Sequence, residues 1–257
     1  MFPKNFILNG CVITDQVAQS LVAQRNRYSY PKAHMCFAVE AGPLHLGDTR
    51  SAEAVHPMAG QITDLDLDRY HTKLLHSNDP VENLLGTIST VFWGFYTFGP
   101  RFAMIRATRH RDGYRGKQAS TPEHVAECLR ACTSEDLGAA LGQLGGLSQL
   151  GRTPFASKVI ALMYPEKAGV LDNKIADALA VSSWAEGAPF QKGIGDVREL
   201  RYQHRYAAWC DFLSTISGRL NVGIDDGAAW HWGKGSTRPQ RWRAIDVERA
   251  LFAYFSD

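Results

Sequence analysis

The spacing of apolar residues predicts helices along most of the chain after residue 78. From Asp79 to Gly99, apolar residues recur every three or four positions, which is the period of one helix face. Asp79-Pro80 is a typical helix start, and Gly99-Pro100 ends the pattern. Thr121-Pro122 opens another helix that runs to about Ala131. Further helices are expected at about 13–27, 134–144, 153–162, 175–180, 196–217 and 244–255.

The first 78 residues have a weaker pattern. A short strand is expected at 35–39, whereas residues 42–60 are rich in Gly, Pro and His and predict a loop. The sequence therefore predicts a mainly α fold, with a less regular N-terminal region that leaves room for α+β structure.

Composition and charge then limit the function classes. The chain has 257 residues, 45% hydrophobic and 21% charged, with a formal net charge of +2, which excludes a histone-like polycation. DNA binding remains compatible because it needs a basic face, and the stretches 101–117 and 234–243 are strongly basic. No apolar run is long enough to span a membrane, and the five cysteines are scattered and odd in number. We expect reduced thiols and a cytoplasmic, nucleoid-associated protein.

One segment carries candidate chemistry. Residues 147–172 read LSQLGRTPFASKVIALMYPEKAGVLD. Gly151 is expected to permit a tight turn that leaves backbone N–H groups exposed, next to a helix that begins at Thr153-Pro154. Amides at a helix N-terminus bind a phosphate well, and Arg152 and Lys158 add positive charge there.

This segment resembles the helix–hairpin–helix base-excision DNA glycosylases (the HhH-GPD superfamily). Leu147, Leu150 and Gly151 match a family hairpin that reads roughly L-P-G-V-G. Val170-Leu171-Asp172, followed by the helical sequence 173–179, matches the loop, aspartate and helix that follow in the family. Ser148 and Gln149 depart from the hairpin, and Thr153 stands where bifunctional members have a Schiff-base lysine. Thr153 and Asp172 are 19 positions apart, about the family's separation.

The resemblance implies a two-lobed helical fold and a monofunctional DNA glycosylase. Residues 79–196 would form the core, 1–78 a base-pocket region or accessory lobe, and 197–257 helices that pack back on the core. Asp172 would be the catalytic carboxylate, because hydrolysis of an N-glycosidic bond builds positive charge on the deoxyribose. Residues implied in DNA contact are Gln149, Gly151, Arg152, Thr153, Ser157, Lys158 and Lys174; those implied in the base pocket or wedge are Trp93, Tyr96, Phe98 and Tyr28.

Double-stranded DNA is the expected partner of a monomer that does not enter the membrane. We expect no cofactor, no iron–sulfur cluster and no resident metal, although a monovalent or divalent cation at the hairpin turn is compatible with DNA binding. The excised base is open: a damaged base is one option, and a phage-modified cytosine such as glucosylated hydroxymethylcytosine, removed in antiviral defence, is another.

Two alternatives from other classes remain. Asp172 also stands at a helix start, where an aspartate serves as an N-cap, so the protein could bind duplex DNA through the hairpin without catalysis. In the other alternative, the protein is helical and has no nucleic-acid role.

Overall fold

The mainly helical fold predicted from the sequence is confirmed by the computed structural model, which describes residues 13–47, 49–58, 60–182, 188–191, 194–222, 230–233 and 240–256. Its α-helices are α1 (Asp15–Arg27), α2 (Asp64–Leu75), α3 (Pro80–Phe95), α4 (Pro100–Asp112), α5 (Pro122–Ala131), α6 (Leu137–Gln143), α7 (Thr153–Met163), α8 (Asn173–Val181), α9 (Leu200–Leu220) and α10 (Ala244–Tyr254). Short 3-10 turns, η1 (Tyr96–Phe98) and η2 (Leu144–Gly146), follow α3 and α6. Lys234 and Arg238 of the second basic stretch lie outside the described residues.

The expected loop at 42–60 is wrong, because this region forms most of a small sheet. The strands β1 (His34–Phe37), β2 (Leu44–Gly47) and β3 (Arg50–Val55) are antiparallel, in the order β1-β3-β2. Alternate residues of β2 are buried, because the sheet packs one face against α3. Because this region is rich in Gly and Pro, the short alternation of buried and exposed residues in β2 did not predict a strand.

Two helices have no counterpart in the sequence prediction. In α2, Thr63 and Asp66 form a reciprocal capping box, and Asp68 is buried. In α4, a basic sequence forms a helix whose small residues Ala103 and Ala107 face the core. The apolar faces of both helices are narrow, so the periodicity was weak.

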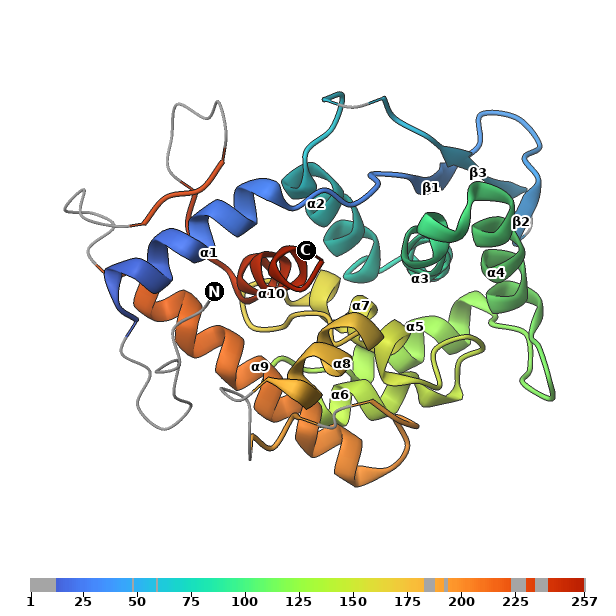
Figure 1. Cartoon of the computed structure of the whole chain (residues 1–257). Coiled ribbons are helices and arrows are strands. Elements are labelled where there is room, and N and C mark those ends of the chain that lie inside the picture. Colours follow the sequence, from blue (N-terminus) through green and yellow to red (C-terminus); the bar gives the residue numbers. More distant parts are fainter. Residues whose placement is uncertain are drawn as a thin grey trace.

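Helix α3 lies at the centre of the molecule and organises the elements around it. Asp79 caps its first turn, where Oδ1 accepts a hydrogen bond from the Val81 N–H at 2.9 Å. Every side chain from Asn83 to Phe95 is buried, because α2, α4, α5, α7 and the sheet all pack against this helix. Figure 1 shows the sheet beside α3 and α4, with α1, α9 and α10 at the other end of the molecule. One hydrophobic core runs through all three segments that we expected as domains.

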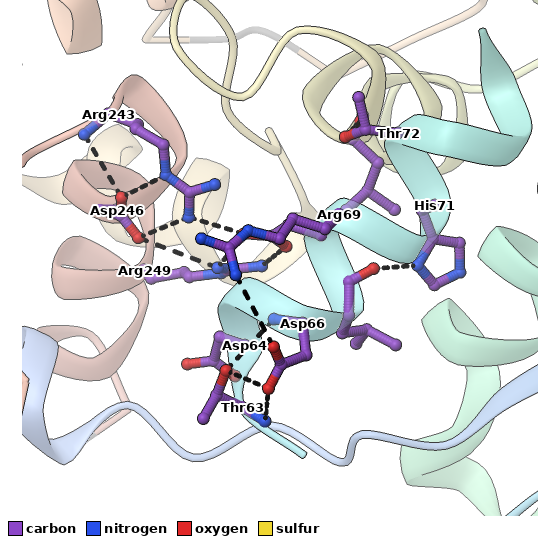
Figure 2. A network of polar contacts seen from close by, with 12 residues as sticks. Thr63, Asp64, Asp66, Arg69, His71, Thr72, Arg243, Asp246 and Arg249 are labelled. Carbon is purple, nitrogen blue, oxygen red and sulfur yellow. Dashed lines mark hydrogen bonds and ion pairs between the residues drawn. The ribbon is translucent and has the colours of Figure 1, made fainter. Parts of the chain in front are cut away.

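A buried ion network joins α1, α2 and α10 (Figure 2). Asp68 of α2 accepts hydrogen bonds from Arg249 at 2.5 and 2.9 Å and from Arg243 at 2.6 Å. Asp246 of α10 accepts from Arg25 of α1 at 3.0 and 3.2 Å and from Arg243 at 2.7 Å. Because the carboxylates and two of the arginines are almost fully buried, each charge depends on its partner for solvation. The network therefore fixes α10 between the N-terminal helices.

Among the described residues, no helix is long and apolar enough to cross a membrane.

Replacing Asp68 with Asn should destabilise the protein strongly. The substitution removes the buried carboxylate that accepts from Arg249 and Arg243, and only Arg243 keeps a close second partner, Asp246, so the free energy of unfolding should fall by about 3–5 kcal/mol. Asp211→Asn, on the exposed face of α9, is the control and should change it by less than about 0.5 kcal/mol. Chemical denaturation of both variants measures the difference, and a small effect at Asp68 would contradict this account.

The same pair predicts how stability depends on acid. Burial alone would raise the pKa of Asp68, but the charges and hydrogen bonds of Arg249 and Arg243 lower it to about 2 from an ordinary 3.8. A depressed carboxyl pKa stabilises the folded state above the unfolded-state value, and that contribution disappears as the pH falls through the folded-state value. Wild-type stability should therefore drop between about pH 4 and pH 2, and Asp68→Asn should lack this part of the drop.

Candidate active site

A turn joins η2 to α7 where the sequence predicted a hairpin, and it depends on a different residue from the one predicted. Gln149 adopts a φ of 69°, in the left-handed region, whereas Gly151 has no positive φ. The Gly151 carbonyl accepts a hydrogen bond from the Val197 N–H at 3.2 Å, and Thr153 N–H donates to the Gly195 carbonyl at 3.1 Å. The hairpin is thus tied to the segment before α9, and this amide at the start of α7 is already used.

The hairpin also rests on α4. The Ser148 hydroxyl donates to the Arg109 carbonyl at 2.8 Å, and the Ser148 carbonyl is hydrogen-bonded to His110 Nδ1. His110 is buried, and its other ring nitrogen contacts the Thr87 hydroxyl at 2.9 Å. Burial lowers the pKa of His110 to about 4, so its imidazole is neutral near pH 7 and serves as a link between helices.

The loop that leads to Asp172 is held by buried side chains of α7 and α9. Tyr206 donates its hydroxyl to the Gly169 carbonyl at 3.1 Å, and Trp209 donates Nε1–H to the Val170 carbonyl at 3.1 Å. The Ser157 hydroxyl accepts from the Leu171 N–H at 3.1 Å. Because consecutive backbone groups are fixed in this way, the position of the next residue, Asp172, is set before any ligand binds.

Asp172 is the N-cap of α8. Its Oδ1 accepts a hydrogen bond from the Ile175 N–H at 3.0 Å, and its side chain is half-buried. A helix N-terminus favours negative charge, so this position suits an ionised carboxylate. Capping uses one oxygen, which accounts for part of the hydrogen-bonding capacity of the carboxylate.

Lys158 and Glu248 carry charge close to Asp172. Lys158 lies on α7, where its Nζ donates to the Pro154 carbonyl at 3.3 Å and its stem runs against Gly94 of α3. Glu248 lies on α10 against Gly169: a Cβ at Gly169 would come within 2.8 Å of the Glu248 Cβ. Both side chains are buried, and both interact electrostatically with Asp172. Glycine at 94 and 169 is what allows these close approaches.

Burial pushes Lys158 and Glu248 toward their uncharged forms. Burial lowers the pKa of Lys158, and the negative charges of Asp172 and Glu248 oppose that shift. Burial and then the nearby charge of Asp172 raise the pKa of Glu248 well above its usual range. Near neutral pH, Glu248 is therefore the group of this cluster for which burial and the charge of Asp172 favour the protonated form.

Aromatic rings form a wall beside these groups. Tyr28 and Tyr30 stack with ring centroids 6.5 Å apart, and both meet the edge of Phe252 from α10. The Tyr30 hydroxyl donates to the Gly94 carbonyl at 3.2 Å, and burial raises its pKa to about 12, with Asp172 adding to the shift. Lys174 reaches over the Phe252 ring, 5.1 Å from its centroid, from the first turn of α8.

An exposed aromatic and basic face lies next to this cluster. Phe98 is 72% exposed and contacts Phe95, which stacks on Phe155 at 4.0 Å. Phe155 in turn lies 5.5 Å from the Nζ of Lys158. The face continues along α4 and the hairpin through exposed or half-exposed side chains, namely Arg101, Phe102, Ile105, Arg106, Arg109 and Arg152.

A cavity of about 520 Å³ is lined in part by Tyr28. Its lining includes Arg25, whose guanidinium lies 3.9 Å from the Trp232 ring centroid, and Asp64. Asp172, Lys158 and Glu248 are not part of this lining, whereas Tyr28 and Arg25 are.

Some predicted site residues lie elsewhere than expected. Thr153, Ser157 and Lys158 were expected to contact DNA, but their side chains are buried: Thr153 binds Gly195, Ser157 holds the Asp172 loop, and Lys158 joins the charged cluster. Trp93 is also buried. Its ring contacts the ring of Tyr30, and its Nε1–H donates to the Pro31 carbonyl at 2.9 Å. Tyr96 points away from the site, toward His56. Gln149, Arg152, Lys174, Tyr28 and Phe98 are at least partly exposed.

The sequence analysis missed Glu248 and Phe252. A signal was present, since Asp246, Glu248 and Arg249 place three charges inside an otherwise apolar helix. Buried charges of this kind mark ion pairs or functional sites. These residues are more than 70 positions from Asp172, so the sequence did not indicate that α10 lies beside Asp172 in the fold.

Comparison with known proteins leaves the site to be interpreted from its own geometry. No family model matches this chain, and neither a curated protein nor a solved structure matches it.

Proposed function

We propose that this protein is a DNA glycosylase that hydrolyses the N-glycosidic bond of an extruded damaged or modified base and leaves an abasic site. The observation that supports it best is the setting of Asp172. This carboxylate follows a hairpin and a loop held by buried hydrogen bonds, and it lies between a buried lysine, a buried glutamate and an aromatic wall.

The setting of Asp172 suits the charge changes in this reaction. As the bond from C1′ to the base breaks, positive charge develops on the deoxyribose, and a carboxylate beside it stabilises that state. The same carboxylate accepts a proton from the water that attacks C1′. Lys158, which interacts electrostatically with Asp172, supplies a buried basic group beside this carboxylate.

The face around Phe98 suits a duplex whose base has left the stack. Extrusion leaves a gap that an apolar side chain can fill, and Phe98 is the most exposed aromatic side chain beside the cluster. Arg101, Arg109 and Arg152 on the same face supply charge for phosphates on either side of the gap.

A second candidate function is duplex binding without catalysis. The capping hydrogen bond from Asp172 to the Ile175 N–H is by itself a sufficient structural reason for an aspartate here. Such a protein would bind duplex DNA with a steep salt dependence and release no base.

Asp172→Asn separates the two functions without disturbing the fold. Asparagine caps a helix as well as aspartate does, so thermal stability should be unchanged. Base release should fall by about 100-fold or more, because the charge that stabilises the transition state is gone. Mass spectrometry of bases released from a panel of genomic and phage DNAs measures the effect, with Asp177→Asn on the exposed face of α8 as the control. Equal release by wild type and Asp172→Asn would exclude the mechanism.

Phe98→Ala tests the proposed DNA face. The side chain is mostly exposed, so stability should hardly change, while base release from duplex DNA should fall about 10-fold through loss of the stacking surface. Val222→Ala is a matched control, because Val222 is equally exposed at the end of α9. The proposal for this face fails if both variants act on duplex DNA at the wild-type rate.

Hydrolysis by Asp172 also predicts that no covalent amine intermediate forms. Lys158 should remain an ammonium because the carboxylate of Asp172 lies beside it, and an ammonium does not attack the abasic aldehyde. Borohydride treatment during turnover should therefore trap no protein–DNA adduct. An adduct that persists in Lys174→Met but disappears in Lys158→Met would show instead that Lys158 is the nucleophile.

A further inference from the structure

We infer that Glu248 is a second catalytic carboxyl of this site, an uncharged acid that gives its proton to the extruded base as the bond to the sugar breaks. This inference rests on the proposed function, and it assigns the leaving-group side of that reaction. The sugar side belongs to Asp172.

Helix α10 places Glu248 at the site from the opposite side to α7 and α8. Its carbon stem packs on Gly169, three residues before Asp172, and a methyl group at Gly169 would collide with it. Phe252, one turn further along α10, lies on the same helix face and contacts Tyr28, Tyr30 and Lys174. Glu248 and Phe252 thus face the turn that carries Asp172.

The carboxyl of Glu248 is buried, but no hydrogen bond among the described residues holds it in place. It is 4% exposed, yet it makes no hydrogen bond to any residue of the described chain, whereas its neighbours Asp246 and Arg249 are fully engaged in the ion network. Arg249, Lys158 and Arg25 act on this nearly buried carboxyl through their charge, but no hydrogen bond from the described part of the chain fixes it, so it is available to a ligand.

The surroundings favour a proton on this carboxyl at neutral pH. Burial and the charge of Asp172 raise the pKa of Glu248, while positive charges of Arg249, Lys158 and Arg25 oppose the rise. Ionisable groups face Glu248 from several elements. They are Asp172 at the N-terminus of α8, Lys158 of α7, Arg25 of α1, Arg249 of α10, Tyr206 of α9, and Tyr28 and Tyr30 in the segment after α1. The surroundings therefore favour the protonated carboxyl of Glu248 at neutral pH.

The reaction balances with these two carboxyls and one water. The Glu248 O–H transfers its proton to a ring nitrogen or carbonyl oxygen of the base, and the electron pair of the C1′–N bond leaves with the base. Water then adds to C1′, and its proton goes to Asp172. Transfer of that proton to Glu248, directly or through solvent, restores both groups. A base with an acceptor atom next to its glycosidic bond is the substrate class that this acid fits.

Glu248→Gln is the central test, because the amide keeps the shape and a hydrogen-bond donor but has no proton to give. Single-turnover base release, on the DNA from which wild type releases base fastest, should be about 100-fold or more slower, and the loss of activity at alkaline pH that we expect of wild type should vanish from the residual rate. Glu248→Asp should recover part of the rate and keep the alkaline limb. Glu166→Gln is the control, since burial also raises the pKa of Glu166 but it lies outside the site.

A second measurement does not need activity. In protein labelled with carbon-13 at glutamate carboxyls, one resonance should titrate well above the ordinary value of 4.5, and it should persist in Glu166→Gln and be absent in Glu248→Gln. A wild-type rate in Glu248→Gln, a slower rate with an unchanged pH profile, or a Glu248 resonance already ionised at neutral pH each overturns the inference. If Asp172→Asn abolishes release and Glu248→Gln does not, only the second acid is wrong; if wild type releases no base, the proposed function itself fails.

Discussion

The buried ion network of Asp68 and Asp246 with Arg25, Arg243 and Arg249 is the constraint on which the site depends. Breaking an ion pair in a protein interior is strongly destabilising, because the charge that loses its partner remains without solvation. The network therefore admits only one placement of α10 relative to α1 and α2. One face of α10 is committed to it, and the neighbouring face presents Glu248 and Phe252 to the Asp172 loop.

The site is accordingly shared between distant parts of the chain. Helix α7 brings Lys158, the start of α8 brings Asp172, the segment after α1 brings Tyr28 and Tyr30, and α10 closes the cluster. Each contribution is fixed by contacts outside the cluster itself. Tyr206, Trp209 and Ser157 hold the Asp172 loop, and the ion network holds α10. Preorganisation of this kind lets charged groups keep protonation states that water would not favour.

The elements that the sequence predicted well are those whose signal is local. Asp79-Pro80 and Thr121-Pro122 each mark a helix start, because an N-cap side chain and proline act within one turn, and at α7 proline alone gives this signal at Pro154. Asp172 follows the same rule at α8. Helices α2 and α4 and the strands at 44–55 were missed because packing against α3, rather than a local pattern, stabilises them.

For the site, the sequence singled out the hairpin and Asp172 as candidates, since spacing along one segment carries that information, and it named Phe98 as a candidate wedge. Only the tertiary structure decided that Lys158 is buried against Asp172 instead of facing solvent, and that Glu248 and Phe252 belong to the same cluster. The physical reason is that burial and electrostatic coupling depend on what the fold places opposite a side chain. No local pattern relates α10 to a loop more than 70 residues away.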